Sequence, residues 1–428
     1  MKVLAEVQED RVGERIVLAE SAAGTRIALT RQPGFATSAA HVGVRFGSND
    51  LRFLGSARGP VEVPTGSAHF LEHKLFEGRD EKVFDRFARL GADFNGGTSF
   101  ALTTYHFQTA SHFEEALEVL LDFVQHPRIT PERVEKEKGI IEQEVRMYED
   151  HPGYRGFFLL HRALYALHPV RVPPGGSVAD VHRTTAGDLQ ACFDAFYQPS
   201  RLRLALAGDF DPERVLARVE ALLDPADRGP CGTRIPIEEP PLPAASRLVD
   251  HFRITRPHAY LGWRDARGTG LGLPLLRRRL TTALALEMLF DPSSETHEDL
   301  YLRGIVDDSF HASVSADADW SHVICAGETE DPERFFQELR SAAERFAAQG
   351  PAESDFARVL KAAWGRVVTG AQTPDALAGS ILHDLLDELH PFAVLDLLAG
   401  LRATDVAERA RELFLPERCA EALLLPDA

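Results

Sequence analysis

The sequence predicts an α+β protein that contains two duplicated αβ domains. A chain of 428 residues, with 44% hydrophobic and 26% charged side chains, is too long for one compact core. The segment 188–199 precedes an apolar run, and the same spacing recurs at 405–416. Between these repeats, the proline-rich stretch 224–246 has the composition of a linker. We therefore expect an N-terminal domain at 1–228, a linker at 229–246 and a homologous C-terminal domain at 247–428.

Strand-like runs alternate with turns in the first part of the chain. These runs are 15–18, 26–29 and 42–46. Pro64-Thr65-Gly66-Ser67 follows them, and the pattern then becomes helical. Ser67 is the expected N-cap of this helix, because a serine hydroxyl accepts hydrogen bonds from the free backbone N–H groups of a first turn.

Helical and strand-like segments alternate after this first helix. Residues 83–90 are predicted to form a helix that ends at Gly91, and 94–109 to form two strands joined by a glycine turn. Apolar residues recur at helical spacing in 114–124 and 131–148. The second of these helices is long and highly charged.

The most informative stretch is His69-Phe70-Leu71-Glu72-His73, which has the pattern H-x-x-E-H. On a helix, this spacing sets His69 and His73 one turn apart on one face, with Glu72 between them. Two imidazoles can hold zinc, which lowers the pKa of a water from about 15.7 towards about 7. Glu72 could then act as general base without binding the metal, and pass the proton to the departing amine. The alternative is an accidental pattern in a chain with 17 histidines.

A zinc hydrolase keeps three protein ligands and one open position, so a further ligand must come from elsewhere in the chain. Glu144 is the candidate. Glu137 lies two helical turns before Glu144 on the same helix face and could orient a ligand histidine. The alternative is a solvated charged helix, in which neither glutamate has a metal to serve.

Asn95, Gly96, Gly97 and Thr98 are the candidate substrate-binding residues. They could form the tip of a strand whose edge pairs with an extended peptide, because glycine lets another backbone approach closely. An ordinary hairpin turn is the alternative. The spare histidines are expected to be structural or solvated, because none has a partner at ligand spacing. They are His106, His151, His161 and His168.

The C-terminal repeat is not expected to rebuild this site. In the repeat alignment, the three motif positions are occupied by Ala283, Leu286 and Glu287. No carboxylate occurs between Asp355 and Asp375, in the segment that matches the long charged helix. One half is therefore expected to be catalytic and the other not.

Composition and charge argue against several partners. The formal net charge of −18 would repel nucleic acid, and no basic stretch offsets it. The four cysteines form no C-x-x-C pair, which argues against a thiolate zinc site and a dense disulfide framework. The N-terminus develops no signal-peptide core, and no run reaches the length of a membrane span. We expect a cytoplasmic protein with no nucleic-acid partner and no membrane partner.

These motifs carry a resemblance that covers the whole chain. Residues 69–78 and 135–144 resemble the zinc helix and the third-ligand helix of the pitrilysin, insulin-degrading enzyme and mitochondrial processing peptidase family. Tyr197-Gln198-Pro199 and Ala207-Gly208-Asp209-Phe210 continue the likeness to the end of the first half. The chain also resembles a bacterial subgroup linked with elongation factor P 5-aminopentanol modification, with which it shares the segment Glu-Lys-Glu-Lys-Gly-Ile-Ile.

The resemblance implies a mitochondrial-processing-peptidase-like metallohydrolase fold, in which each domain is a mostly antiparallel sheet packed with helices. It also implies one Zn²⁺ per chain and the activity of a zinc metalloendopeptidase. The implied metal ligands are His69, His73 and Glu144, the implied catalytic residues are Glu72 and Glu137, and the implied substrate-binding residues are Asn95, Gly96, Gly97 and Thr98.

Two features depart from the family's pattern. Gly96 and Gly97 stand where the family more often has alanine and a larger residue. In the second half, Arg303 is not followed about two helical turns later by the tyrosine that substrate-binding relatives usually carry. The second half is therefore not expected to clamp substrate itself.

Full-length family members enclose substrate between two such duplicated units, and this chain supplies one. The resemblance thus implies hydrolysis of short or unfolded peptides in a closed chamber formed with a second chain. We expect a hetero-oligomer with a homologous zinc-free chain, and a homodimer is the alternative assembly. The alternative function is a structural or assembly subunit with little activity on its own, as some relatives are in respiratory complexes.

Overall fold

The computed structural model describes residues 1–55, 59–265 and 268–427, and the chain divides into two compact units. Each unit takes segments from both sides of the predicted linker. Unit 1 contains residues 1–145, 173–236 and 367–392, and unit 2 contains residues 146–172, 237–366 and 393–428.

Among the described residues, unit 1 is built on a seven-stranded sheet. Its neighbouring strands are antiparallel except for the parallel pair β3 and β9. In spatial order the strands are β1 (Lys2–Glu9), β2 (Glu14–Glu20), β3 (Arg26–Arg31), β9 (Arg203–Gly208), β4 (Ser38–Val44), β8 (Thr103–Thr109) and β7 (Asp93–Thr98). A small sheet beside it contains β10 (Thr233–Arg234), β5 (Arg52–Leu54) and β6 (Pro60–Glu62).

Unit 2 has a five-stranded sheet within the described part of the chain. In spatial order its strands are β11 (Arg247–Phe252), β15 (Cys419–Pro426), β12 (His258–Arg264), β14 (Ser321–Glu328) and β13 (His311–Ala316). The pair β11 and β15 is parallel, and the other neighbours are antiparallel. The five strands β3-β9-β4-β8-β7 of unit 1 have the same arrangement. Their first pair, β3 and β9, is parallel, and the remaining neighbours are antiparallel. The predicted fold class of two duplicated αβ domains with mostly antiparallel sheets is therefore confirmed.

Helices cover these sheets. Those of unit 1 are α1 (Ser67–Phe76), α2 (Val83–Leu90), α3 (Phe113–Gln125), α4 (Pro131–Glu149), α6 (Val178–Arg183), α7 (Ala186–Phe196), α8 (Pro212–Leu222) and α13 (Pro374–Leu386). Those of unit 2 are α5 (Pro152–Leu164), α9 (Leu273–Phe290), α10 (Glu295–Leu302), α11 (Pro332–Gln349), α12 (Glu353–Gly370), α14 (Ala393–Gly400) and α15 (Ala403–Leu413). The ends of α4 and α12 extend past the unit boundaries.

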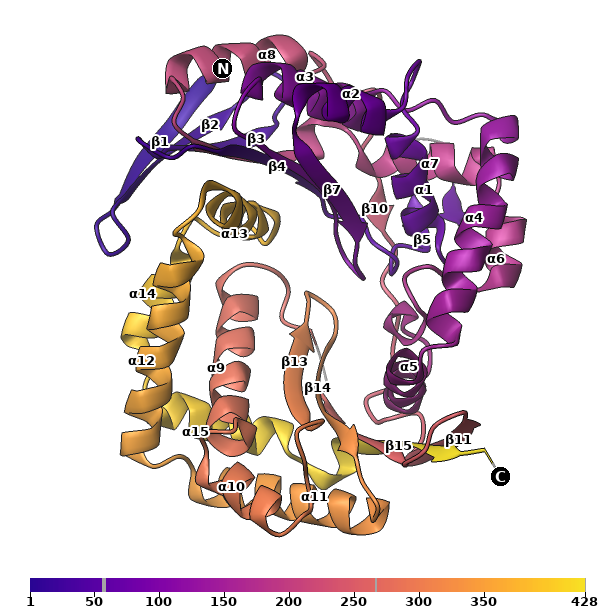
Figure 1. Cartoon of the computed structure of the whole chain (residues 1–428), viewed down its shortest axis with the longest axis vertical. Coiled ribbons are helices and arrows are strands. Elements are labelled where there is room, and N and C mark those ends of the chain that lie inside the picture. Colours follow the sequence, from indigo (N-terminus) through magenta and orange to yellow (C-terminus); the bar gives the residue numbers. More distant parts are fainter. Residues whose placement is uncertain (56–58, 266–267, 428) are drawn as a thin grey trace. The chain divides into compact units, whose positions relative to one another are not determined.

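The two halves of the chain exchange one helix each. Helix α5 follows α4 in the first half of the chain, but it packs on strands β15, β12 and β11 of unit 2 (Figure 1). Helix α13 follows α12 in the second half, but it packs on strands β4 and β9 of unit 1 (Figure 1). The sequence repeat did not predict this reciprocal placement, because it depends on contacts between segments far apart in the chain.

Ion pairs tie α13 to the sheet of unit 1 in addition to its apolar face. Asp375 Oδ1 lies 2.8 Å from His41 Nε2 on β4, and Asp387 Oδ1 lies 2.8 Å from Arg45 Nη1. Leu377, Leu382 and other apolar side chains of α13 are buried. Burial of this apolar face provides the larger part of the attachment, since isolated ion pairs near a surface contribute little.

The predicted local elements recur with small shifts, and two local predictions are wrong. The two strands predicted within 94–109 are present as β7 and β8, but Gly96 and Gly97 lie inside β7 and the connecting residues 99–102 include no glycine, so the predicted glycine turn is wrong. The N-cap of α1 is Gly66, not Ser67, which is the first helical residue. Gly66 has φ 84°, in the left-handed region, and a Cβ atom there would lie 2.4 Å from the carbonyl oxygen of Gly175. Ser67 Oγ instead donates a hydrogen bond to Pro64 O at 2.7 Å. Glycine is needed at the cap because another backbone segment touches it.

No helix in the described ranges combines the length and the apolar character that a membrane span requires.

Candidate metal centre

Helix α1 presents the histidines of the H-x-x-E-H motif on its polar face. Phe70, Leu71 and Leu75 are at most 1% exposed and fix the opposite face of the helix in the core of unit 1. His69 and His73 are thereby held one turn apart and half-buried, facing α4. The sequence folds in this way locally because the apolar and metal-binding side chains follow different stripes of one helix.

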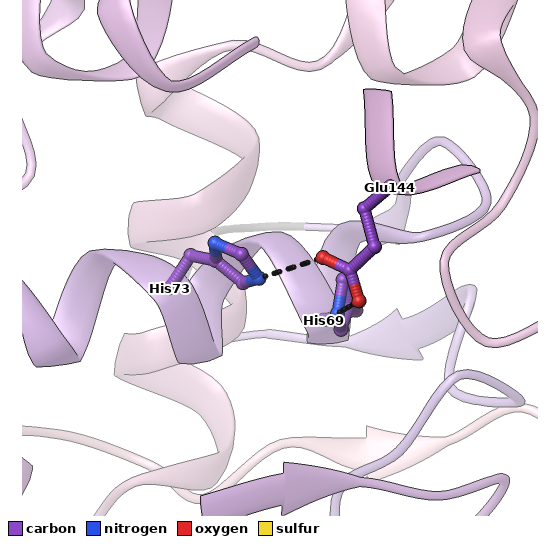
Figure 2. A group of neighbouring side chains, drawn as sticks. All are labelled: His69, His73 and Glu144. Atoms are coloured by element: carbon purple, nitrogen blue, oxygen red, sulfur yellow. Dashed lines mark ion pairs between the residues drawn. The ribbon is translucent and has the colours of Figure 1, made fainter. Parts of the chain in front are cut away.

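Glu144 on α4 meets both histidines (Figure 2). Its Oε1 lies 3.6 Å from His69 Nε2, and its Oε2 lies 3.4 Å from His73 Nε2. These separations exceed ordinary hydrogen bonds of about 2.7–3.2 Å. They are close to the spacing of about 3.3–3.4 Å between ligands that each lie about 2.0–2.1 Å from a tetrahedral zinc ion.

The three side chains form the one cluster of potential metal ligands found among the described residues, with ligand atoms within 4.8 Å of one another. Two imidazoles and one carboxylate are a donor set that catalytic zinc sites use, with one position left for solvent or substrate. The arrangement therefore fits a zinc ion without rearrangement of the helices.

Glu137 orients His73 from the other side of the ring. Its Oε1 lies 3.1 Å from His73 Nδ1, so the hydrogen bond leaves Nε2 directed at Glu144. Glu137 Oε2 in turn lies 3.7 Å from Nζ of Lys74, a side chain that is fully buried. Lys74 Nζ also donates to Arg133 O of α4 at 2.8 Å and pairs with Glu77 at 2.5 Å. Lys74 thus joins the two helices that supply the ligands.

The sequence interpretation missed Lys74, although a signal was present. Lys74 follows Phe70 by four positions and Leu71 by three, so helical spacing places it on the buried face. A buried lysine requires a charged or hydrogen-bonding partner, and Glu137 and Glu77 provide it. The close contact of the loop at Gly175 with the start of α1 had no comparable signal, because it depends on the tertiary fold.

Charges within the cluster shift the pKa values of its members. The imidazoles of His69 and then His73 hold the pKa of Glu144 well below its usual value, and the hydrogen bond from His73 lowers the pKa of Glu137. Burial lowers the pKa of His73, but Glu137, Glu144 and the charge of Glu72 outweigh burial and raise the pKa to about 9. At neutral pH the metal-free chain therefore carries a proton on the His73 ring, and a zinc ion bound there would have to displace it.

Zinc affinity should consequently depend on pH. Below the His73 pKa of about 9, zinc must displace the proton, so we expect the affinity to fall about ten-fold for each pH unit of acidification. Above this pKa the affinity should level off. Competition with a chelator of known, pH-corrected affinity measures the profile, and a flat profile between about pH 7 and about pH 9 would contradict the assigned proton.

Glu137→Gln tests the orienting role. The variant keeps the shape of the side chain but loses its charge, so zinc affinity should fall about 10–100-fold, as expected for a carboxylate behind a ligand histidine. It should also lower the pH at which the affinity levels off, since Glu137 helps to raise the pKa of His73. Glu135→Gln on the same helix is the control, because Glu135 pairs with Lys138 instead. An affinity equal to that of the parent would exclude Glu137 from this role.

Glu72 lies beside the three ligand residues but outside the cluster itself. The side chain is 8% exposed, and its Oε2 accepts a hydrogen bond from Thr98 Oγ1 at 2.7 Å. Tyr105 and Tyr197 lie nearby with their hydroxyl oxygens 3.1 Å apart. Burial, and then charges that include Glu72, raise the pKa of Tyr105, so this hydroxyl stays protonated next to the carboxylate. Thr98 is therefore placed to orient Glu72, a role beyond the predicted substrate contact.

Asn95 to Thr98 form part of β7, which is the last strand of the sheet and pairs with β8. Asn95 and Gly97 are exposed, and no atom lies within 4 Å of where a Cβ atom of residue 97 would stand. Gly96 faces inward, where a Cβ atom would lie 2.7 Å from the Phe76 ring. The first glycine thus serves packing against α1, and the second leaves the surface of the strand open.

The second half lacks a comparable cluster in the region described. Ala283, Leu286 and Glu287, which the repeat alignment sets opposite the three motif positions, lie on α9 and line a pocket together with β13. Glu287 pairs with Arg366 of α12 at 2.5 Å, so an ion pair connects the two helices there. Arg303 pairs with Asp299 at 2.9 Å and with Glu338.

Other proteins are similar to this chain in sequence and in fold. The sequence profile of insulinase, peptidase family M16, matches residues 54–174, and the profile of the peptidase M16 inactive domain matches residues 183–363. A Bacillus subtilis protein described as the uncharacterized zinc protease YmfH is 31% identical over 98% of this chain and 99% of its own. The chain belongs to the insulinase family, peptidase family M16. The predicted resemblance to pitrilysin, insulin-degrading enzyme and mitochondrial processing peptidase is thereby confirmed.

Solved structures share this fold. A putative M16-like peptidase from Alicyclobacillus acidocaldarius has a TM-score of 0.93 and 31% identity, and the match covers 98% of this chain and 100% of that one. A Helicobacter pylori protease has a TM-score of 0.82, with 96% of this chain and 99% of that one covered, and at 17% identity it shows the shared fold. The narrower likeness to the subgroup linked with elongation factor P stays a prediction, as does the cytoplasmic location.

Proposed function

We propose that this M16 family member is a zinc endopeptidase that hydrolyses short or unfolded peptides in a closed chamber formed with a second chain. The observation that carries the proposal is the convergence of His69, His73 and Glu144, with Glu72 next to them and outside the ligand set. A scaffold protein has no physical reason to retain a ligand cluster, an orienting carboxylate and a base together. One Zn²⁺ per chain would be held by the three ligands.

Each residue of the centre has a distinct part in the proposed reaction. Bound zinc would supply Lewis acidity, which polarises the scissile carbonyl and makes a water acidic near neutral pH. Glu72 accepts a proton from the attacking water and later gives it to the departing amine. Thr98 holds the Glu72 carboxylate in place through the 2.7 Å hydrogen bond, and Glu137 keeps the His73 ring aligned.

Strand β7 is the proposed substrate-binding edge. It ends the seven-stranded sheet and connects through Thr98 to the base, so a peptide added along it would pass the metal centre. Exposed Asn95 and Gly97 leave that edge accessible to a peptide backbone, and Gly96 keeps the strand close to α1. This arrangement favours extended substrates over folded ones, because the backbone must be free to form ladder hydrogen bonds.

A second, homologous and zinc-free chain is the proposed partner, and a homodimer is the alternative. Substrate-binding relatives usually carry an arginine followed by a tyrosine in this part of the second half. Here the arginine is Arg303, and it already forms ion pairs with Asp299 and Glu338. The partner would therefore supply the missing Arg/Tyr pair. Co-purification from the native host tests this, and a stable homodimer with full activity would contradict it. We also propose that 1–228 is the N-terminal domain, 229–246 the linker and 247–428 the homologous C-terminal domain.

Zinc analysis coupled to a peptide-library digest is the experiment that tests the proposed function. The chain alone and the reconstituted pair should be compared in one assay. Stoichiometric zinc and cleavage that depends on Glu72 would support an endopeptidase. Stoichiometric zinc without cleavage by either preparation would favour an assembly subunit with little activity of its own.

A further inference from the structure

Unit 1 contains a pocket towards the edge of the sheet that is opposite to the metal centre. It has a volume of about 450 Å³ and lies over β1, β2, β3 and β9, next to the segment that follows α13. The metal centre lies beside β7, at the other edge of the same sheet. One wall is apolar and consists of Leu4, Leu18, Ala19, Ile27, Leu385 and Leu389.

Arg203 is an arginine of this pocket that forms no ion pair with the described residues, although the charge of Glu388, which also lines the pocket, acts on it. Its side chain is half-buried, and its Nη1 donates hydrogen bonds at 3.0 Å to the carbonyl oxygens of Ser200 and Leu202. Within the described ranges, no carboxylate oxygen lies within 4.0 Å of its guanidinium nitrogens. The guanidinium charge is thus partly removed from water, and both hydrogen bonds of Nη1 go to neutral acceptors.

A second arginine stands beside it. Arg26 of β3 is the register partner of Arg203 of β9 in the parallel pair, and it also lines the pocket. Arg26 is neutralised by Glu20, with Nε and Oε2 at 2.8 Å. Burial, followed by the charge of Arg26, lowers the pKa of Arg203, and the carboxylates of Glu388 and Glu20 offset only part of this effect. Like charges on adjacent strands are unfavourable unless an anion compensates them.

The shape and charge of the pocket define the ligand that would complement it. A carboxylate can form two charge-assisted hydrogen bonds with a guanidinium group. An apolar group attached to that carboxylate would cover the leucine wall, and the volume lies within the range of about 300–1,000 Å³ of small-molecule sites. We infer that this pocket binds an organic anion in which one carboxylate is joined to an apolar tail.

The pocket also contacts a strained segment. Glu388 lines it and has φ 61°, a left-handed conformation that costs energy for a residue other than glycine. This segment leads out of unit 1, which ends at residue 392. A ligand packed against Leu385 and Leu389 would hold the segment in place.

Calorimetric titration of the full-length chain tests the inference with two probes. Decanoate represents an acyl carboxylate, and a trileucine peptide with a free C-terminus represents a peptide carboxylate, titrated into Glu72→Gln so that it is not cleaved. One site per chain is expected for at least one probe, and binding of either supports the shared chemistry. Decanol and amidated trileucine are the neutral counterparts, which should bind about 10–100-fold more weakly. Equal binding of acid and neutral forms, or no binding of either acid, would overturn the inference.

Substitutions locate the site, because a carboxylate can also bind zinc. Arg203→Met keeps the apolar stem and should weaken binding of the acid about 10–100-fold. Arg218→Met is the matched control, since Arg218 is on α8 and pairs with Glu118. Leu4→Asp provides a second variant at a side chain that is 37% exposed, where folding tolerates the change and the new carboxylate should repel the ligand. Unchanged affinity in both Arg203→Met and Leu4→Asp would place the anion elsewhere.

Discussion

Glu72→Gln is expected to keep its zinc and to lose peptide hydrolysis by about 10²–10⁴-fold, the range that general acid–base catalysis contributes. Glutamine has the same shape as glutamate but cannot accept the proton of an attacking water. Its amide oxygen can still accept the 2.7 Å hydrogen bond from Thr98, so the side chain should stay in position. The zinc ligands are not altered, because Glu72 lies outside the ligand cluster.

The assay is kcat/KM for a fluorogenic peptide, measured together with zinc content on the same preparation. Glu142→Gln is the control, because Glu142 is on α4 and pairs with His182 at 2.8 Å, away from the ligand cluster. It should retain activity. Cleavage by Glu72→Gln at the parental rate would show that another group is the base.

Glu144→Gln should instead remove zinc. The variant loses the anionic ligand that lies 3.4 and 3.6 Å from the two imidazole Nε2 atoms, and a neutral amide is a much poorer zinc ligand. The loss of affinity should exceed the roughly 10–100-fold expected when a carboxylate behind a ligand is removed. Activity should fall in parallel and return in part at high zinc concentration.

Elemental analysis after dialysis against a weak chelator measures this effect. Glu149→Gln is a suitable control, since Glu149 is exposed at the end of the same helix. Comparison with Glu137→Gln shows which of the two carboxylates contributes more to zinc binding, and Glu144→Gln should lose more zinc. Zinc content equal to that of the parent would mean that Glu144 does not bind the metal.

Much of the centre could be predicted because its information is local. The spacing of His69, Glu72 and His73 fixes their common helix face, and the spacing of Glu137 and Glu144 does the same on α4. The likeness to M16 peptidases connected the two helices, which spacing alone could not do. The structure brings the three predicted ligands together and places the predicted supporting acid 3.1 Å from His73.

The features that could not be predicted depend on contacts between distant segments. The N-cap of α1 is set by the loop at Gly175, and the Phe76 ring requires a glycine at position 96. The repeat indicated two similar domains, and the matching strand orders agree with it. It gave no sign that α5, from the first half of the chain, packs on the sheet of unit 2 and that α13, from the second half, packs on the sheet of unit 1. The hydrophobic pattern of a helix does not specify which sheet it covers.

The exchange of α5 and α13 couples the stability of the two units. The chain enters unit 2 shortly before and shortly after α13. While unit 2 is folded, it holds both of these chain ends, so docking of α13 on β4 and β9 closes only short loops. If unit 2 unfolds, the entropic cost of holding α13 on the sheet rises and an apolar face of unit 1 loses its cover. The same holds for α5 and unit 1. A destabilising substitution in either unit is therefore transmitted to the other, and the two should melt as one cooperative system.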